Sequence, residues 1–250
     1  MTKLKEIVDF LNEHLKNREF EDNSWNGLQV EGREEISKIA FCVTAGLEVF
    51  QKAKNEGADM IVAHHGIFWK ESNPSIKGWM KERVVFLIKN NISFYASHLP
   101  LDAHPEDGNN AQIMKLLEGK IEEPMAPHKG KNIGWIGRIE PITVKDIVRK
   151  LESSLGTKCI VLDRGKEIVE RVAVVSGGAP YNVFEAIEKE VDLFITGDAA
   201  DVLQVVKDAK INVIFAGHYA SEMTGVKALS DLIKNKFGIE AVFIDAPTGL

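Results

Sequence analysis

Short apolar runs alternate with longer amphipathic segments along most of this chain. The short runs are bounded by Gly, Pro or charged residues and predict strands, whereas apolar residues recurring every three or four positions predict helices. We predict strands at 38–44, 59–64, 92–97, 159–163, 171–176, 192–196, 211–216 and 240–244. We predict helices at 3–16, 47–56, 80–90, 109–118, 143–155, 181–190, 199–209 and 221–237. Strands that alternate with helices are typical of βαβ units, so we expect an α/β fold with largely parallel sheets.

Two stretches of the chain share one pattern. The stretch from Ile39 and the stretch from Val172 both show an apolar strand, a glycine turn, a helix, an aspartate and a second apolar strand. Asp59 corresponds to Asp192 when Ile39 is matched to Val172. An internal duplication explains this pattern, although any two βαβ units share part of it. We therefore predict two similar α/β sub-domains, with the Gly- and Pro-rich segment 119–142 as the passage between them.

Composition and charge limit the classes of protein to consider. The chain has 250 residues, 44% of them hydrophobic, and a net charge of −6. A negative balance argues mildly against a protein that coats nucleic acid. Cys42 and Cys159 lie in apolar runs, where lone cysteines are usually core residues. No apolar stretch approaches the about 20 residues that span a bilayer, and the N-terminus is amphipathic. We expect a cytoplasmic protein without a membrane segment.

Five of the seven histidines fall in three short stretches, each at the end of a predicted strand. The stretches are AHHG at 63–66, SHLPLDAHPEDGNN at 97–110 and AGHYASE at 216–222. The carboxyl ends of parallel strands are where open α/β sheets place their ligands. Three histidine-containing stretches at one sheet edge favour a metal site. The alternative is that these histidines are unrelated core or surface residues.

The third and second stretches each offer a histidine and a carboxylate. His218 and Glu222 are four residues apart at the start of a predicted helix, so both side chains lie on one helix face. A surface ion pair is the simpler interpretation of that spacing alone. In the second stretch, Asp102 follows Pro100, which we expect to interrupt regular structure. His98 is either a ligand or a residue that orients a carboxylate, and His104 either assists the site or only satisfies the local backbone.

The adjacent pair His64 and His65 raises the question of why two imidazoles should be neighbours. Successive strand residues point to opposite faces, so we expect Gly66 to let the backbone turn and bring both to one side. Two imidazoles from one loop do not easily share a single ion. They suit two metal ions, which lie about 3.5–4 Å apart in two-metal hydrolases.

Five stretches together resemble the NIF-three-like proteins, which are widely named GTP cyclohydrolase 1 type 2 homologues. These stretches are WNGLQV at 25–30, AHHGIFW at 63–69, SHLPLDAHPEDGNNAQ at 97–112, VSGGA at 175–179 and GHYASE at 217–222. They span almost the whole chain in the expected order. The resemblance implies a NIF-three-like fold in its short form, without the inserted domain of longer members, and a toroidal homohexamer.

The resemblance also implies a dinuclear metal site. His64 and Asp102 would bind one ion, His65 and His218 the other, and Glu222 would bridge the two. For His218 and Glu222 to meet His64 and His65, the C-terminal segment must rejoin the N-terminal half. We therefore expect a discontinuous metal-binding sub-domain of residues 1–125 plus 211–250, and a second sub-domain of residues 126–210.

The ligand set indicates hydrolytic chemistry. Five side chains cannot saturate two ions, so water should fill open positions, and metal binding can lower its pKa to ~7. Mixed imidazole and carboxylate donors suit Zn, Fe, Mn, Co or Ni. We expect a hydrolase that attacks a C–N or phosphoester bond of a small nucleotide-like substrate. Two alternatives stay open: a ring-shaped nucleic-acid-binding or regulatory protein with structural metals, and a metal-trafficking adaptor. SGGAP at 176–180 either contacts a phosphate or only forms a tight turn.

Overall fold

The structure is a computed structural model that describes residues 1–249. The chain forms two units, each built on its own sheet. The first unit contains Met1–Leu101 and Val226–Ala246, and the second contains Asp102–Gly225 and the described residues from Pro247 onward. Both sheets contain parallel strands covered by helices, so the predicted α/β class is confirmed.

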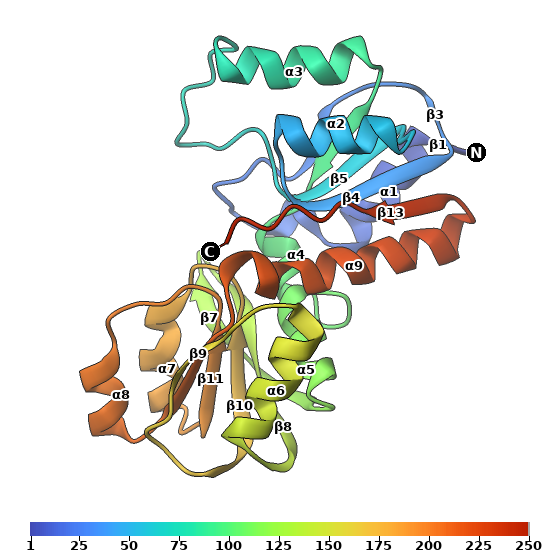
Figure 1. Cartoon of the computed structure of the whole chain (residues 1–250). Coiled ribbons are helices and arrows are strands. Elements are labelled where there is room, and N and C mark those ends of the chain that lie inside the picture. The colour runs from blue at the N-terminus through green and yellow to red at the C-terminus, as the bar shows by residue number, and fades with distance from the viewer. Residues whose placement is uncertain (250) are drawn as a thin grey trace. The chain divides into compact units, whose positions relative to one another are not determined.

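The first unit contains a five-stranded sheet in the order β13-β4-β5-β6-β2. Of these strands, β13, β4 and β5 are labelled in Figure 1. Parallel pairing joins β4 (Lys38–Thr44), β5 (Met60–His65) and β6 (Ser93–Ala96) to one another, and it joins β13 (Glu240–Phe243) to β4. The antiparallel strand β2 (Gly27–Val30) closes the other edge. A separate antiparallel pair joins β1 (Thr2–Lys3) to β3 (Glu35–Ile36).

Helices cover both faces of this first sheet. On one face, α2 (Leu47–Asn55) and α3 (Trp79–Lys89) contribute Phe50 and Leu87 to a core shared with the strands. On the other face, α1 (Leu4–His14) and the short helix η1 (Asn17–Glu19) place Asn12 and Asn17 against the hydroxyl of Tyr95. The C-terminal part of α9 (His218–Phe237) also belongs to this unit, where Phe237 packs edge-on against Phe10.

The second unit contains a six-stranded sheet in the order β7-β8-β10-β11-β12-β9. Its parallel centre consists of β10 (Ile168–Val175), β11 (Leu193–Thr196) and β12 (Asn212–Phe215). The strands β7 (Lys120–His128), β8 (Lys131–Thr143) and β9 (Ile160–Leu162) pair antiparallel. The sheet is therefore mixed, with a parallel centre, rather than largely parallel.

Two layers of helices accompany the second sheet (Figure 1). The short helix η2 (Pro180–Asn182), α7 (Val183–Glu188) and α8 (Leu203–Ala209) follow the parallel strands, and their apolar side chains pack on one face. On the other side, α5 (Asn109–Leu116) and α6 (Val144–Leu155) contact each other and the strands β7, β8 and β10. The helices α4 (Leu99–Ala103) and α9 each contain a boundary between the two units.

The segment 119–142 is a long hairpin of β7 and β8 instead of the connector that its Gly and Pro content suggested. Pro124 and Pro127 lie in β7, which is the edge strand of the sheet. A proline cannot donate a ladder hydrogen bond, and an edge strand tolerates this because one side of it has no partner strand. Gly and Pro therefore mark an edge hairpin here and not a loop.

The unit boundaries also differ from those expected from the sequence. The expected division was 1–125 plus 211–250 against 126–210, whereas the observed units divide after Leu101 and after Gly225. The hairpin of β7 and β8 belongs to the second unit, and β12 pairs with β11 in the second sheet. The first unit is discontinuous in sequence, because β13 returns to pair with β4.

One aspartate in each unit holds the first two parallel strands in the same register. Asp59 accepts backbone hydrogen bonds from Ser37 (2.7 Å) and Lys38 (3.1 Å), and its own amide donates to the Lys38 carbonyl. In the second unit, Asp192 accepts from the amides of Glu170 and Arg171 and donates to the Arg171 carbonyl.

The strand pairing repeats as well. Ile39 lies opposite Met60 in the first unit, and the corresponding Val172 lies opposite Leu193 in the second. The two stretches that matched in sequence therefore have the same strand register, and each has an aspartate whose hydrogen bonds support that register.

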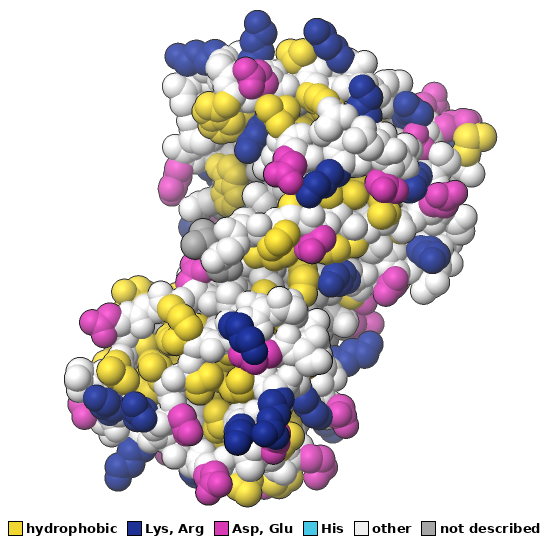
Figure 2. Space-filling view, in the orientation of Figure 1, with side chains coloured by type: hydrophobic (Ala, Val, Ile, Leu, Met, Phe, Trp, Pro, Cys, Tyr) yellow, Lys and Arg dark blue, Asp and Glu magenta, His cyan; other side chains and the backbone are white. Residues whose placement is uncertain are grey.

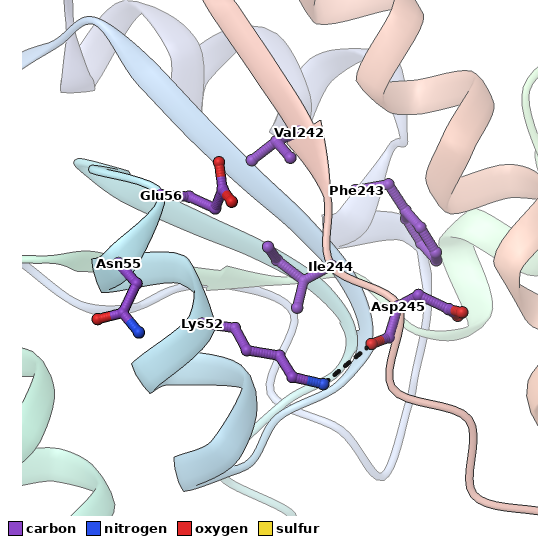
Figure 3. Close-up of a pocket in the computed structure, with 7 residues that line it drawn as sticks. All are labelled: Lys52, Asn55, Glu56, Val242, Phe243, Ile244 and Asp245. Carbon is purple, nitrogen blue, oxygen red and sulfur yellow. Dashed lines mark hydrogen bonds between the residues drawn. The ribbon is translucent and has the colours of Figure 1, made fainter.

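Three further features complete the fold. Lys52 of α2 donates to the backbone carbonyl of Asp245 across a groove between α2 and β13 (Figure 3). None of the residues that line this groove is a predicted site residue. Cys42 is buried and Cys159 is partly exposed, and neither forms a disulfide. Among the helices of the described residues, none is both long and apolar enough to cross a membrane.

We predict that Asp59→Ala destabilises the protein by about 1–3 kcal/mol, because it leaves two partly buried backbone amides without their acceptor and removes a charge-assisted bond from Arg33. The measurement is the free energy of unfolding in urea. Glu56→Ala is the control, since Glu56 is an exposed carboxylate whose contact with Lys38 is 3.4 Å long, and it should change stability by less than about 0.5 kcal/mol. Equal effects of both substitutions would contradict the role of Asp59.

Candidate metal centre

Three imidazoles lie together at the carboxyl ends of β5 and β6. His64 and His65 are the last residues of β5, and His98 follows β6. The ring centroids of His64 and His65 are 4.7 Å apart, and that of His98 is 5.1 Å from His64 and 5.5 Å from His65. One ring nitrogen from each histidine lies within 4.8 Å of the other two. The first unit therefore contains a group of three nitrogen donors suited to a metal ion.

Hydrogen bonds to neighbouring strands orient His64 and His65. The Nδ1 of His64 lies 3.1 Å from the carbonyl oxygen of Ser97, which can only accept, so Nδ1 carries the proton. The Nδ1 of His65 lies 3.0 Å from the hydroxyl of Thr44, at the end of β4. His64 is thus held by the residue that follows β6, and His65 is held by the last residue of β4. With Nδ1 engaged, Nε2 is the ring nitrogen suited to metal coordination.

A buried carboxylate orients His98 in the same way. Its Nδ1 lies 2.9 Å from Asp22, which also accepts hydrogen bonds from the amides of Ser24 and Leu99, both at 3.0 Å. Burial of Asp22 acts to raise its pKa, but the hydrogen bond and charge of His98 outweigh it and hold the pKa well below the usual range. Asp22 is therefore an anion that fixes both the ring of His98 and the loop behind it.

A buried polar network supports Ser97, the acceptor for His64. The Ser97 hydroxyl donates to Asn17 (2.8 Å), and Asn17 donates to the hydroxyl of Tyr95 (2.6 Å). These side chains are almost completely buried, so each hydrogen bond is needed to offset the loss of solvent. The network links the position of His64 to the packing of η1 against the sheet.

Gly66 has a different role from the one expected. His65 still belongs to β5 and lies opposite Thr44 in the sheet, and Gly66 is not among the residues with positive φ. A Cβ atom at Gly66 would lie 2.3 Å from the Gln29 amide and 2.9 Å from the Cβ of Ala96. The glycine is therefore required because β2 and β6 approach closely, and not because the backbone turns between the two histidines.

The second unit carries a group of carboxylates. Asp102 lies in α4 and Glu222 lies in α9, and both are buried. A carboxylate oxygen of Asp102 lies within 4.8 Å of one from Glu222. Asp102 accepts hydrogen bonds from Asn109 (2.8 Å) and from the hydroxyl of Ser176 (3.0 Å). The segment around Pro100 is the start of the helix α4 and not an irregular loop, since proline fits the first turn of a helix.

Two buried asparagines connect Asp102 to the rest of the second unit. The Asn109 amide donates to Asp102, and its oxygen accepts from the backbone of Gly225 in α9 at 2.8 Å. Asn110 donates to the carbonyls of Asp102 and Ile133, and its oxygen accepts from the backbone of Ser176 at 2.6 Å. The GNN motif thus begins α5 and also positions the aspartate.

His218 and Glu222 form the pair that their spacing predicted. The Nε2 of His218 lies 3.1 Å from Glu222, one helical turn away, and Nδ1 lies 3.0 Å from both oxygens of Asp198. The hydrogen bond to Glu222 and the two negative charges overcome partial burial and raise the pKa of His218 to about 9. Without a metal ion the ring is therefore doubly protonated at neutral pH. An ion that binds Nε2 must displace that proton.

The SGGAP segment forms a tight turn against this pair. Gly177 has φ +64°, and its carbonyl accepts hydrogen bonds from Gly197 and Asp198. A Cβ atom at Gly177 would lie 2.2 Å from Glu222. The glycine thus allows the turn to pack directly on the buried carboxylate.

Each unit therefore holds one cluster of the predicted site residues. His64 and His65 lie with His98 in the first unit, and Asp102, His218 and Glu222 lie in the second. In contrast, the Nδ1 of His104 accepts hydrogen bonds from the backbone of Glu106 and Asp107, so this histidine stabilises its own loop.

Sequence reasoning did not identify the residues that hold these clusters in place. They are Asp22, Thr44, Ser97, Asn109, Asn110, Ser176 and Asp198. Two local signals were present: the adjacent asparagines of GNN at 108–110, and the SGGAP turn at 176–180, which contains Ser176.

These features define a class: an α/β protein whose histidine and carboxylate clusters are suited to hold divalent metal ions. The model of the family Duf34/NIF3 (NGG1p interacting factor 3) matches residues 2–249. The chain belongs to this family, as the motifs indicated.

Named relatives agree with this assignment. The chain is 45% identical over 249 residues to a protein of Archaeoglobus fulgidus and 46% identical over 248 residues to one of Pyrococcus horikoshii. Both are called GTP cyclohydrolase 1 type 2 homolog. The first match covers 99% of this chain and 99% of the relative, and the second covers 98% of both. The solved structure of protein ybgI, described as of unknown function, matches with a TM-score of 0.92 at 35% identity over 100% of both chains.

We predict that His218 of the metal-free protein titrates near pH 9, far above the ordinary value near 6.5. The measurement is an NMR titration of the histidine ring signals. Glu222→Gln removes the largest cause of the shift and should move the pKa of His218 back toward 6.5. Because the imidazolium is stabilised in the folded state, this contribution to stability is complete below about pH 6.5 and is lost as the pH rises through about 9. A wild-type value near 6.5 would contradict the described pairing.

We predict that Gly177→Ala weakens divalent-metal binding by at least about tenfold, because the new methyl group displaces Glu222. The measurement is metal affinity by isothermal titration calorimetry. Gly156→Ala is a matched control: Gly156 has nearly the same φ, +65°, but a Cβ atom there would have no neighbour within 4 Å. It should cost about 1 kcal/mol of stability from backbone strain and leave metal affinity unchanged. Equal losses of affinity would attribute the effect to strain alone.

Proposed function

We propose that this protein is a dinuclear metal-dependent hydrolase. His64, His65, Asp102, His218 and Glu222 would together hold two divalent ions of Zn, Fe, Mn, Co or Ni. In this proposal His64 and Asp102 bind one ion, His65 and His218 bind the other, and Glu222 bridges them. The assignment of individual ligands comes from the resemblance to the family and not from the arrangement of the two units.

The observation that carries the proposal is the way the histidines are held. His64, His65 and His218 each have Nδ1 in a hydrogen bond, to a carbonyl, a hydroxyl and a carboxylate, respectively. Metal-ligating histidines characteristically use one ring nitrogen in this way, which fixes the ring and directs the other nitrogen at the ion.

The charges of the two clusters complement each other. The first unit supplies imidazoles, whereas the second supplies the buried carboxylates Asp102 and Glu222. Two buried carboxylates with oxygens within 4.8 Å repel each other, and cations relieve that repulsion. This donor set fits first-row divalent metals better than Mg²⁺ or Ca²⁺, which prefer all-oxygen sites.

The chemistry follows from the open coordination positions that five ligands leave on two ions. When bound, the ions would lower the pKa of a water molecule to ~7 and make it a nucleophile. Around them, Ser176 and Asn109 would keep Asp102 oriented, and Asp198 would keep His218 oriented. Asp22 would hold His98 beside the two histidines of β5.

We infer a nucleotide-like substrate, cleaved at a C–N or phosphoester bond. The relatives named GTP cyclohydrolase 1 type 2 homolog support this substrate class. Three basic residues of β8 and α6 that a nucleic acid could contact are paired with acidic ones: Arg138 with Glu122 and Glu170, Arg149 with Asp146, and Lys150 with Glu118. On the face shown in Figure 2, Lys and Arg side chains are interspersed with Asp and Glu. These observations favour the hydrolase.

We predict about two metal ions per chain by elemental analysis after loading with Zn, Fe or Mn. His65→Ala should reduce the count to about one, because it removes a ligand of one ion. His128→Ala is the control, since His128 lies in β7 and belongs to none of these clusters, and it should keep both ions. No metal uptake by the wild-type protein, or two ions in His65→Ala, would contradict the dinuclear centre.

The hydrolase itself is tested by turnover of GTP, cyclic amides and phosphodiesters. We expect activity on at least one of them, abolished by a chelator and restored by the metal, and reduced by at least about a thousandfold in His65→Ala. Two bound ions with no turnover of any substrate would instead support a metal-trafficking adaptor. DNA or RNA mobility shifts that persist after metal removal would support the nucleic-acid alternative.

A further inference from the structure

A rigid pair of backbone segments adjoins the imidazole cluster of the first unit. The amide of Trp25 donates to the carbonyl of Phe68 (3.1 Å), and the amide of Lys70 donates to the carbonyl of Asn23 (2.7 Å). Ser24 and Trp69 form an antiparallel bridge between these hydrogen bonds. Residues 23–25 and 68–70 are therefore paired like two short strands, although each continues into a loop.

The side-chain amide of Gln29 forms hydrogen bonds with the backbone of both segments or the residue next to them. Its amide nitrogen donates to the carbonyl of Trp25, and its oxygen accepts from the amides of Ile67 (2.8 Å) and Phe68 (3.3 Å). The residue that precedes the first segment is Asp22, whose carboxylate holds the ring of His98. Asp22 thus links this surface to the imidazoles, because it accepts hydrogen bonds both from the amide of Ser24 and from the ring of His98.

Trp69 forms the inner part of this surface. Its indole N–H donates to the Gly66 carbonyl (3.2 Å), which fixes the ring. The ring centroid lies 5.1 Å from that of His98, edge to face, and 6.0 Å from that of His65. An aromatic side chain thus directly adjoins two of the three histidines.

Trp25 forms the outer part and is unusually exposed for its size. Its side chain is 56% exposed although its backbone is fixed on both sides. The ammonium group of Lys70 lies 5.7 Å from the centroid of the Trp25 ring, within cation–π range. A large aromatic side chain that the fold leaves in water is available for a partner that the fold does not provide.

We propose that Trp25, Trp69 and Lys70 bind the substrate of the neighbouring centre, with Trp25 stacking on a flat heteroaromatic ring and Lys70 pairing with an anionic group attached to it. The ligand class is therefore a nucleotide, in which a flat nucleobase carries an anionic phosphate. This inference rests on the proposed function for its substrate but adds the residues that would select it. Indole rings stack on any nucleobase, and a lysine acts as a point charge for phosphate.

The test uses GMP and guanosine as probes and measures binding by isothermal titration calorimetry in the presence of EDTA, so that metal ions do not capture the phosphate. Wild-type protein should bind GMP saturably. Trp25→Ala should bind it about tenfold more weakly, as expected when one stacking contact is lost. Lys70→Ala should weaken GMP binding several-fold while leaving guanosine binding unchanged, because guanosine carries no phosphate.

Trp79→Ala is the matched control. Trp79 is 60% exposed and has its own cation–π contact, with Arg83, but it lies on α3. It should bind GMP like the wild type. Unchanged GMP binding in Trp25→Ala, equal losses in Trp25→Ala and Trp79→Ala, or no saturable binding to the wild type at millimolar GMP would each overturn the proposal.

The metal counts and turnover assays described above keep this proposal separate from the proposed function. A protein that binds GMP through Trp25 but holds no metal would overturn the hydrolase and leave the stacking surface intact. A protein that holds two metals and hydrolyses a substrate, but binds GMP equally well in Trp25→Ala, would overturn only the stacking surface.

Discussion

The register of the parallel strands is the constraint on which both side-chain clusters depend. A slip of one residue along a strand moves every side chain to the opposite face. Asp59 fixes the start of β4 against β5, and the resulting register places His65 opposite Thr44 at the other end of the same pair. In the second unit Asp192 performs the same task for β10 and β11. The position of His65 therefore depends on hydrogen bonds at the far end of its own strand.

The two units use one scaffold for different chemistry. The first unit places imidazoles at the ends of β5 and β6, whereas the second places Asp198 after β11 and His218 after β12. In the aligned repeat, Asp198 corresponds to His65: the first unit carries a nitrogen donor where the second carries a carboxylate that orients a histidine. The same strand pattern thus ends in imidazoles in the first unit and in an aspartate–histidine pair in the second.

Local pattern was sufficient for the parallel strands and for the residues of the clusters, because apolar runs ending in His, Gly or Asp are visible along the chain. Local pattern was insufficient where the role of a residue depends on a contact with a residue far away in the sequence. Asp22 lies far from His98 and Asn17 far from Ser97, so neither contact leaves a local signal. The prolines of β7 resembled a loop because an edge position cannot be recognised before the sheet is known. The sequence suggested that Gly66 allows the backbone to turn. In the structure, a glycine is required at this position because Gln29 packs too closely to leave room for a Cβ atom.

From the resemblance to the family, we propose that His64, His65, Asp102, His218 and Glu222 hold two metal ions. The most direct measurement is a crystal structure of the zinc-loaded protein, with anomalous diffraction collected above and below the zinc edge. The account predicts two anomalous peaks about 3.5–4 Å apart, one bound by His64 and Asp102, the other by His65 and His218, with Glu222 touching both. A single peak held only by His64, His65 and His98, or no peak at these residues, would contradict it.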